Sequence, residues 1–172
     1  PEGRRRPAIV AAPLRRSADA RAANLNRHFP SAACHDGLSA AVRQRVQNEF
    51  LSGKLEVIVA TMAFGMGIDK PDVRTVIHTA LPGSLEAYYQ EIGRAGRDGE
   101  PAETMLLYGL GDMALRRQFI EQEDAGDDHK RREHKRLDAL LAYCEASQCR
   151  RMSLPAYFDE TSQPCGNCDN CL

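Results

Sequence analysis

The chain has 172 residues, of which 42% are hydrophobic and 27% charged, a composition typical of a globular protein with a buried core. No apolar run reaches the about 18 residues that a membrane-spanning helix needs, and no apolar region follows the arginine-rich beginning, so neither a membrane span nor a secretory signal is expected. The formal net charge of −1 excludes a globally basic nucleic-acid binder but leaves room for a local basic surface.

The first part of the chain alternates short apolar runs with amphipathic segments. Ser17, Ser39 and Ser84 precede helical patterns and are predicted to cap them, and Gly53 is predicted to end the second helix. In chain order the pattern predicts strand 8–12, helix 17–29, strand 31–35, helix 40–52, strand 55–60, strand 74–80, helix 84–92 and strand 103–108. Strands that alternate with helices indicate an α/β fold with a parallel sheet and right-handed crossovers.

The last part of the chain differs in composition. Residues 121–128 are acidic without a basic residue and include Gly126, which is typical of a solvated linker. Residues 130–136 then reverse the sign of the charge. We therefore place a boundary near residues 109–112, with one domain at 1–109 and a small, mainly helical domain at 110–172.

A glycine-rich segment, 60–74, follows the strongest predicted strand, at the edge of the sheet where open α/β proteins bind ligands. Gly65 and Gly67 permit close approach of a ligand to the backbone, and Thr61 offers a hydroxyl for a phosphate. Asp69 offers a carboxylate for a ribose hydroxyl or a cation. The segment is not a P-loop, because GxxxxGK[ST] does not occur in the sequence, and an ordinary glycine-rich turn is the alternative.

A second segment, 90–99, holds Arg94 and Arg97 among three glycines, directly after a predicted helix. A guanidinium is permanently charged, and its fork of donors matches phosphate oxygens. An arginine in this place could therefore reach the γ-phosphate of a nucleotide held elsewhere. An exposed turn with solvated arginines is the alternative.

The third segment is the cysteine-rich C-terminal region. The chain has six cysteines, and this number, without a sign of secretion, indicates metal ligands or free thiols in a cytoplasmic protein. Four thiolates suit a closed tetrahedral zinc site of the structural type, whereas an iron–sulfur cluster or disulfides are the alternatives. Cys144 continues an apolar helix face and Cys34 is isolated, so both are predicted to pack in the interior. The predicted zinc ligands are Cys149, Cys165, Cys168 and Cys171.

In combination, these segments resemble the second motor lobe and the zinc-binding domain of RecQ-family DNA helicases. The resemblance covers about residues 35–172. Its motifs, in chain order, are HDGL, ATMAFGMGIDKPDVR, EAYYQE, GRAGRDG, PAE and the terminal CRR…YF…PCGNCDNCL. ATMAFGMGID is similar to motif V and QEIGRAGRDG to motif VI of superfamily 2 helicases.

The resemblance implies a RecA-like lobe of a 3′–5′ DNA helicase that uses ATP and Mg²⁺ and acts in DNA repair and recombination. Arg97 would be the arginine finger, Arg94 its neighbour at the nucleotide cleft, and Gln90 a residue that positions the γ-phosphate or the attacking water. Asp69 and Gly67 would lie at the nucleotide, and Thr61 would face the DNA backbone. The implied partners are DNA, single-stranded or partly duplex, and ATP shared with a first motor lobe. A monomer, no membrane partner and a cytoplasmic location at bacterial nucleoid DNA are expected.

The sequence departs from the family pattern in two places. AAPLRR follows the first strand where the family has a different motif IV, which leaves Arg15 or Arg16 to make that contact. The Walker A lysine and the Mg²⁺ site of a first lobe, and the winged-helix and HRDC domains, are absent from the 172 residues. We therefore expect negligible ATPase activity from this chain alone. The alternative function is a non-enzymatic, zinc-containing nucleic-acid-binding module whose contacts come from residues 130–136.

Overall fold

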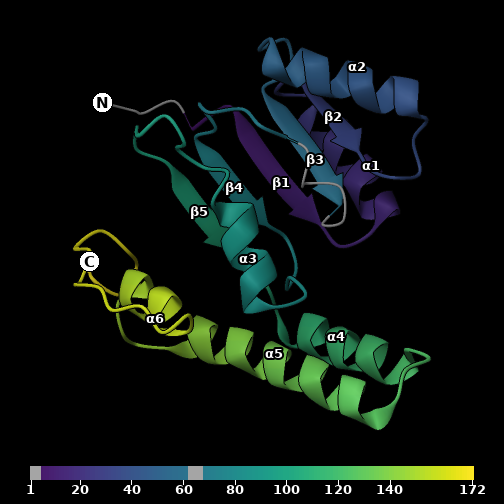
Figure 1. The fold of residues 1–172 in the computed structure, drawn as a ribbon. Coiled ribbons are helices and arrows are strands. Elements are labelled where there is room, and N and C mark those ends of the chain that lie inside the picture. Colours follow the sequence, from purple (N-terminus) through teal and green to yellow (C-terminus); the bar gives the residue numbers. More distant parts are fainter. Residues whose placement is uncertain (1–4, 62–67) are drawn as a thin grey trace. The chain divides into compact units, whose positions relative to one another are not determined.

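The computed structural model describes residues 5–61 and 68–172. Five strands form one parallel sheet in the order β2-β3-β1-β4-β5 (Figure 1). Every strand pair is parallel, and the central strand pairs with β3 on one side and β4 on the other. The strands are β1 Ala8–Ala12, β2 Ser31–Cys34, β3 Val57–Thr61, β4 Thr75–His78 and β5 Glu103–Leu106. The predicted α/β fold is confirmed.

The two helices α1, Arg15–Leu25, and α2, Ala40–Leu51, cover opposite faces of this sheet. Ala18 and Ala22 of α1 pack in a cluster with Val10 and Val59, whereas Val46 and Phe50 of α2 pack in a second cluster with Ile9 and Ile58. Successive residues of a strand point to opposite faces, so the alternation along β1 and β3 divides the core into these two layers. All five residues of β1 and of β3 are buried, as the apolar runs predicted.

The observed ends of the helices show which of the predicted serine caps are correct. The hydroxyl of Ser39 accepts a hydrogen bond from the Val42 amide at 3.3 Å, which confirms it as the N-cap of α2. Gly53 follows the same helix with φ +79°, a conformation that favours glycine. The predicted cap Ser17 is wrong by three residues: α1 begins earlier, Leu14 is the N-cap, and the Ser17 hydroxyl accepts from the Leu14 amide at 3.2 Å.

The chain divides into two compact units. The first contains 1–82 and 90–116, and the second contains 83–89 and 117–172. Helices α3, Leu85–Ile92, and α4, Leu110–Gln122, each have residues in both units. The division predicted at residue 109 stays a prediction.

The second unit is helical, with α5, Asp127–Glu145, and α6, Arg150–Ala156. Leu137, Leu140 and Leu141 form the buried face of α5, as the spacing predicted. The acidic stretch 121–128 is not one extended linker, because it includes the end of α4 and the first turn of α5. Carboxylates in the first turn of a helix interact favourably with its dipole, and this local gain allows the helix to begin there. No helix of the described residues is long and apolar enough to cross a membrane.

Candidate functional site

The first candidate site lies where β3 ends and the chain leads on toward β4. Thr61 ends β3, is 8% exposed, and its hydroxyl makes no hydrogen bond with the described residues. Gly65 and Gly67 lie outside the described residues. Beyond them Ile68 is buried, whereas the side chain of Asp69 is 83% exposed. Of the predicted residues in this segment, Asp69 is therefore the one that presents an accessible charge.

Arg94 is a buried arginine, only 8% exposed. Its Nη1 donates to the carbonyl oxygen of Ile68 at 2.9 Å, so it ties the glycine-rich segment to the end of α3. Its Nε is buried without a hydrogen-bond partner among the described residues. Burial, and then the nearby charge of Arg97, lower the pKa of Arg94, although a guanidinium stays protonated at any ordinary pH.

Arg97 differs from Arg94 in that its side chain is 42% exposed. Its Nε donates to the carbonyl oxygen of Gly93 at 3.0 Å, and its Nη1 contacts Asp69 Oδ1 at 2.6 Å. An exposed ion pair of this kind contributes at most about 1 kcal/mol, so a phosphate could displace the carboxylate at little cost. The structure thus brings together Arg94, Arg97 and Asp69, which the sequence had placed in two separate segments.

The loop that carries these arginines depends on one glycine. Gly96 has φ +63°, and a Cβ there would lie 2.8 Å from the carbonyl oxygen of Glu100. Its amide donates to the carbonyl oxygen of Val73 at 2.9 Å, which joins the loop to the segment directly before β4. A larger residue would be strained twice, by its backbone conformation and by this contact.

Gln90, near the end of α3, has an exposed side chain. The neighbouring Glu91 contacts His78, whose side chain is completely buried at the end of β4. Neither His78 nor Glu91 is among the predicted site residues. A histidine at the end of an apolar strand was the available signal, because a buried imidazole needs polar partners.

The second candidate site is a cluster of four cysteines. Their Sγ atoms all lie within 4.8 Å of one another, with Cys149 and Cys165 at 3.5 Å and Cys149 and Cys168 at 3.9 Å. Zn–S bonds of about 2.3 Å in a tetrahedron require sulfur atoms about 3.8 Å apart, so the arrangement fits a four-thiolate metal site. The cluster contains Cys149, Cys165, Cys168 and Cys171, which is the predicted set.

Backbone amides support the thiolate form of this cluster. The Cys165 amide donates to Cys149 Sγ at 3.3 Å, and the Arg150 amide donates to Cys168 Sγ at 3.4 Å. The first of these hydrogen bonds is the main cause that lowers the pKa of Cys149 to about 6. A thiol must be deprotonated to bind a metal, so these amides favour the metal-binding form.

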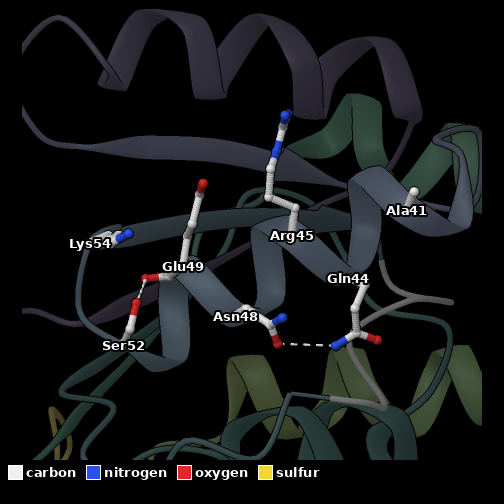
Figure 2. Close-up of a pocket in the computed structure, with 7 residues that line it drawn as sticks. All are labelled: Ala41, Gln44, Arg45, Asn48, Glu49, Ser52 and Lys54. Carbon is white, nitrogen blue, oxygen red and sulfur yellow. Dashed lines mark hydrogen bonds between the residues drawn. The ribbon is translucent and has the colours of Figure 1, made fainter.

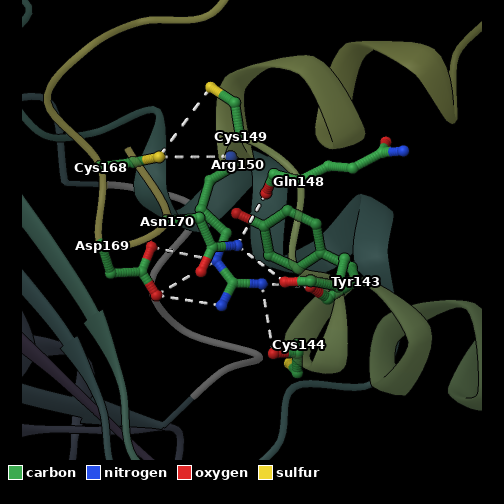
Figure 3. Close-up of polar contacts among 9 residues, drawn as sticks. Tyr143, Cys144, Gln148, Cys149, Arg150, Cys168, Asp169 and Asn170 are labelled. Carbon is green, nitrogen blue, oxygen red and sulfur yellow. Dashed lines mark hydrogen bonds and ion pairs between the residues drawn. The ribbon is translucent and has the colours of Figure 1, made fainter. Parts of the chain in front are cut away.

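Arg150 connects the cluster to the end of α5 (Figure 3). Its guanidinium pairs with Asp169 at 3.0 Å and donates to the carbonyl oxygens of Tyr143 and Cys144. Asn170 adds two hydrogen bonds of 2.7 Å to backbone carbonyls of the same connection. The loop that carries the last cysteines is therefore attached to α5 by side chains as well as by the cluster.

The remaining predicted residues lie outside both sites. Cys34 is fully buried in the core, and burial raises its pKa to about 11, as expected of an inert thiol. Cys144 is partly buried and is not in the metal cluster. In the basic stretch 130–136, Lys130 donates to the carbonyl oxygen of Glu121 at 2.7 Å and Arg136 pairs with Glu133 at 2.8 Å. Arg131, Arg132 and Lys135 of the same stretch are exposed, so the predicted nucleic-acid surface stays a prediction.

A surface depression of 630 Å³ lies along the outer side of α2 (Figure 2). Its lining residues come from α2 and the turn that follows, and Figure 2 shows Arg45 extending from the helix. None of the predicted site residues lines it.

Family models match both parts of the chain. The model described as helicase conserved C-terminal domain matches residues 2–99, and the model described as RecQ zinc-binding matches residues 110–172. The ATP-dependent DNA helicase RecQ of Haemophilus influenzae is 45% identical over 148 residues, which are 86% of this chain and 24% of that protein. The RecQ of Bacillus subtilis is 40% identical over 165 residues, 95% of this chain and 28% of that protein. The chain therefore spans about a quarter of the length of these two relatives.

Solved structures share the fold. A DEAD box protein from Methanococcus jannaschii is 28% identical with a TM-score of 0.56, over 67% of this chain and 32% of that chain. The Escherichia coli DEAD-box protein SrmB matches with a TM-score of 0.56 at 23% identity, over 71% of this chain and 76% of that chain. The parallel sheet thus has the RecA-like architecture of helicase lobes. With its helicase domain match, its zinc-binding match and these relatives, the chain belongs to the helicase C-terminal domain family and, within it, to the RecQ helicases.

Proposed function

We propose that this chain is the second motor lobe and zinc-binding domain of an ATP-dependent 3′–5′ DNA helicase, with Arg97 as its arginine finger. The observation that carries the proposal is the contrast between the two arginines of the glycine-rich loop. Arg94 is buried and bound to a backbone carbonyl, whereas Arg97 is accessible and held by an exposed carboxylate. A finger must be ordered before the reaction and free to move onto a phosphate, and Arg97 meets both conditions.

The nucleotide would be shared with another lobe. No P-loop occurs in the 172 residues, so the groups that cradle phosphates and Mg²⁺ would come from elsewhere. Arg97 would then supply charge to the γ-phosphate as its negative charge is redistributed in the transition state, a role worth about 10³–10⁵ in rate. Arg94 would keep the loop against the segment that ends at Ile68, and Gln90 would position the phosphate or the attacking water. Asp69, released by Arg97, would face the ribose.

Contacts with DNA would be made through its backbone. A motor that moves over any sequence needs phosphate contacts, which carry no base information. Thr61 is proposed for such a contact because its hydroxyl has no hydrogen-bond partner among the described residues and lies at the C-terminal end of β3. Repair and recombination are the processes in which such an activity would serve.

The zinc-binding role is structural in this proposal. The four sulfur atoms have the spacing of a closed tetrahedral site with no position left for a substrate, and the family match is to a zinc-binding domain. A colourless preparation with about one zinc per chain is expected, whereas iron and a brown colour would indicate an iron–sulfur cluster instead.

Joining the chain to a P-loop lobe from a RecQ relative tests the catalytic role. The 172 residues by themselves should hydrolyse ATP negligibly, and the joined protein should show DNA-stimulated ATP hydrolysis. Arg97→Ala should then lower kcat by about 10³-fold or more with ATP binding largely kept. Arg45→Ala, which removes an exposed arginine from the outer side of α2, should leave kcat unchanged. Normal turnover in Arg97→Ala would show that the finger is another residue.

The alternative, a non-enzymatic nucleic-acid-binding module, predicts tight binding without a motor lobe. Titration of labelled single-stranded DNA with the chain at two salt concentrations separates the two. The module requires micromolar or better affinity that falls steeply with salt. The binding-module alternative would be excluded if the chain bound single-stranded DNA weakly and if Arg131→Ala and Arg132→Ala left that affinity unchanged.

A further inference from the structure

Arg74, directly before β4, is a nearly buried arginine to which the sequence patterns assigned no role. Its side chain is 14% exposed, and its guanidinium contacts Asp72, Pro101 and Asp98. Its Nε donates to the carbonyl oxygen of Asp72 at 3.0 Å and its Nη1 to that of Pro101 at 3.2 Å. Its Nη2 forms an ion pair with Asp98, the residue that follows Arg97.

Asp98 is held on both its backbone and its side chain. Its amide donates to the carbonyl oxygen of Pro71 at 3.2 Å, and its Oδ1 accepts from the Glu100 amide at 3.1 Å. Although burial opposes the effect, the Glu100 amide and the Arg74 guanidinium lower the pKa of Asp98. Asp98 is therefore an ionised partner of Arg74 at neutral pH.

The attachments lie on either side of Arg97. Before it, the Gly96 amide donates to the carbonyl oxygen of Val73, and after it Asp98 pairs with Arg74. Arg97 itself contributes, among the residues that the structure describes, a hydrogen bond to Gly93 and the contact with the exposed Asp69. The backbone on which Arg97 stands is thus fixed by one arginine and one carboxylate 24 residues apart, while its guanidinium keeps a displaceable partner.

We infer that Arg74 and Asp98 are positioning residues that fix the loop from which Arg97 projects. The inference rests on the proposed role of Arg97, because its effect on turnover passes through that side chain. The arginine fork matters here, since one guanidinium spans the carboxylate and two carbonyl oxygens at the same time. A lysine would keep the charge but could not span all three.

Nuclear magnetic resonance of the labelled chain tests the positioning without any enzymatic activity. In Asp98→Asn, the heteronuclear NOE of the Arg97 Nε–H should fall toward the value of the exposed Arg45, whereas that of the buried Arg94 should stay high. Arg74→Lys should shift the Arg97 signal in the same direction. Glu56→Gln, which removes an ion pair with Arg6 elsewhere in the same unit, is the matched control and should leave Arg97 unchanged. An unaltered Arg97 signal in Asp98→Asn and Arg74→Lys would overturn the inference.

Kinetics of the protein joined to a P-loop lobe give the second readout. Asp98→Asn should lower kcat about 10- to 100-fold, the scale expected of a small misplacement, with the KM for ATP nearly unchanged. A merely destabilising change would lower the melting temperature and the active fraction but leave the kcat of the folded enzyme as it was. If Arg74→Ala does not fold, Arg74→Lys and Asp98→Asn carry the test.

The two proposals fail in different ways. If Arg97→Ala keeps full turnover while Asp98→Asn still mobilises Arg97, the positioning stands and the finger assignment is wrong. If Arg97→Ala abolishes turnover but Asp98→Asn changes neither the Arg97 signal nor kcat, the positioning role of Arg74 and Asp98 is wrong.

Discussion

The two units of this chain are stabilised by different means. The sheet unit buries β1 and β3 completely between two helices and has a core that includes Phe50 and Ile58, both at 0% exposure. The helical unit buries fewer apolar side chains: Leu85 and Tyr88 of α3, Ile120 of α4, Leu137, Leu140 and Leu141 of α5, and Leu154 of α6. Its last residues form no helix or strand and converge on four cysteines. Where apolar burial is small, a metal can supply the missing free energy.

The arginines of the two units show the same contrast between structural and functional use. Arg150 is held by a carboxylate and two backbone carbonyls, and Arg74 in the sheet unit is held in the same manner. Arg97 has one exposed carboxylate and one carbonyl. A guanidinium whose donors are all engaged inside the protein serves the fold, whereas one with a displaceable partner is available to a ligand.

Removal of zinc should have the largest effect on stability, and it should unfold one unit while leaving the other folded. A chelator, or Cys168→Ser, should unfold much of the helical unit, because structural zinc sites contribute on the order of 10 kcal/mol. Hydrogen exchange measured by mass spectrometry should show protection lost in α5 and α6 but kept in β1 and β3. Cys144→Ser, outside the cluster, is the control and should retain zinc. Equal loss of protection in both units would contradict the comparison.

Truncation of a core side chain should destabilise the sheet unit and leave the helical unit and its zinc site intact. Phe50→Ala in α2 should lower the free energy of unfolding of the sheet unit by about 3–5 kcal/mol, because it leaves a cavity in a fully packed site. The zinc content should remain about one per chain. Leu51→Ala, at a neighbouring position that is 48% exposed, should cost far less. Denaturant unfolding and metal analysis measure both quantities, and zinc loss in Phe50→Ala would mean that the units are not independent.

Loss of a helix cap should be a smaller and purely local change. Ser39→Ala removes the acceptor for the Val42 amide and should cost about 1 kcal/mol, all of it in the sheet unit. Gln44→Ala, on the exposed side of the same helix, serves as the control. A shift in the unfolding of α5 in Ser39→Ala would again argue against the independence of the two units.

The smallest expected effect is the acid dependence of an exposed ion pair in the sheet unit. The Arg15 guanidinium, opposed by a small burial effect, lowers the pKa of Asp36 below its usual 3.8. A lowered pKa in the folded state stabilises the protein above the unfolded value, and this contribution is lost as the pH falls below 3.8 and through the folded pKa. Between pH 7 and 5 the melting temperature of Asp36→Asn should therefore differ from that of the parent by a constant amount. The difference should shrink only in stronger acid.

Much of the fold and of the metal site was predictable because the signals are local. Apolar runs separated by amphipathic segments identify buried parallel strands, and the spacing of Cys165, Cys168 and Cys171 indicates a cysteine cluster, since both depend on residues close in the sequence. The start of α1 and the acidic stretch 121–128 were not predicted correctly. In both places the helix extends beyond the point that the capping residue or the charge pattern suggested.

The sequence by itself thus determined the α/β class, the four cysteines of the candidate metal site and the two arginines of the glycine-rich loop. Only the tertiary structure decided which arginine is buried and which is accessible, and that Asp69 and Arg97 meet across 28 residues. It also decided that Arg74 holds Asp98. Burial and partner choice depend on how distant segments pack at the edge of the sheet, and no local pattern of residue types records that packing.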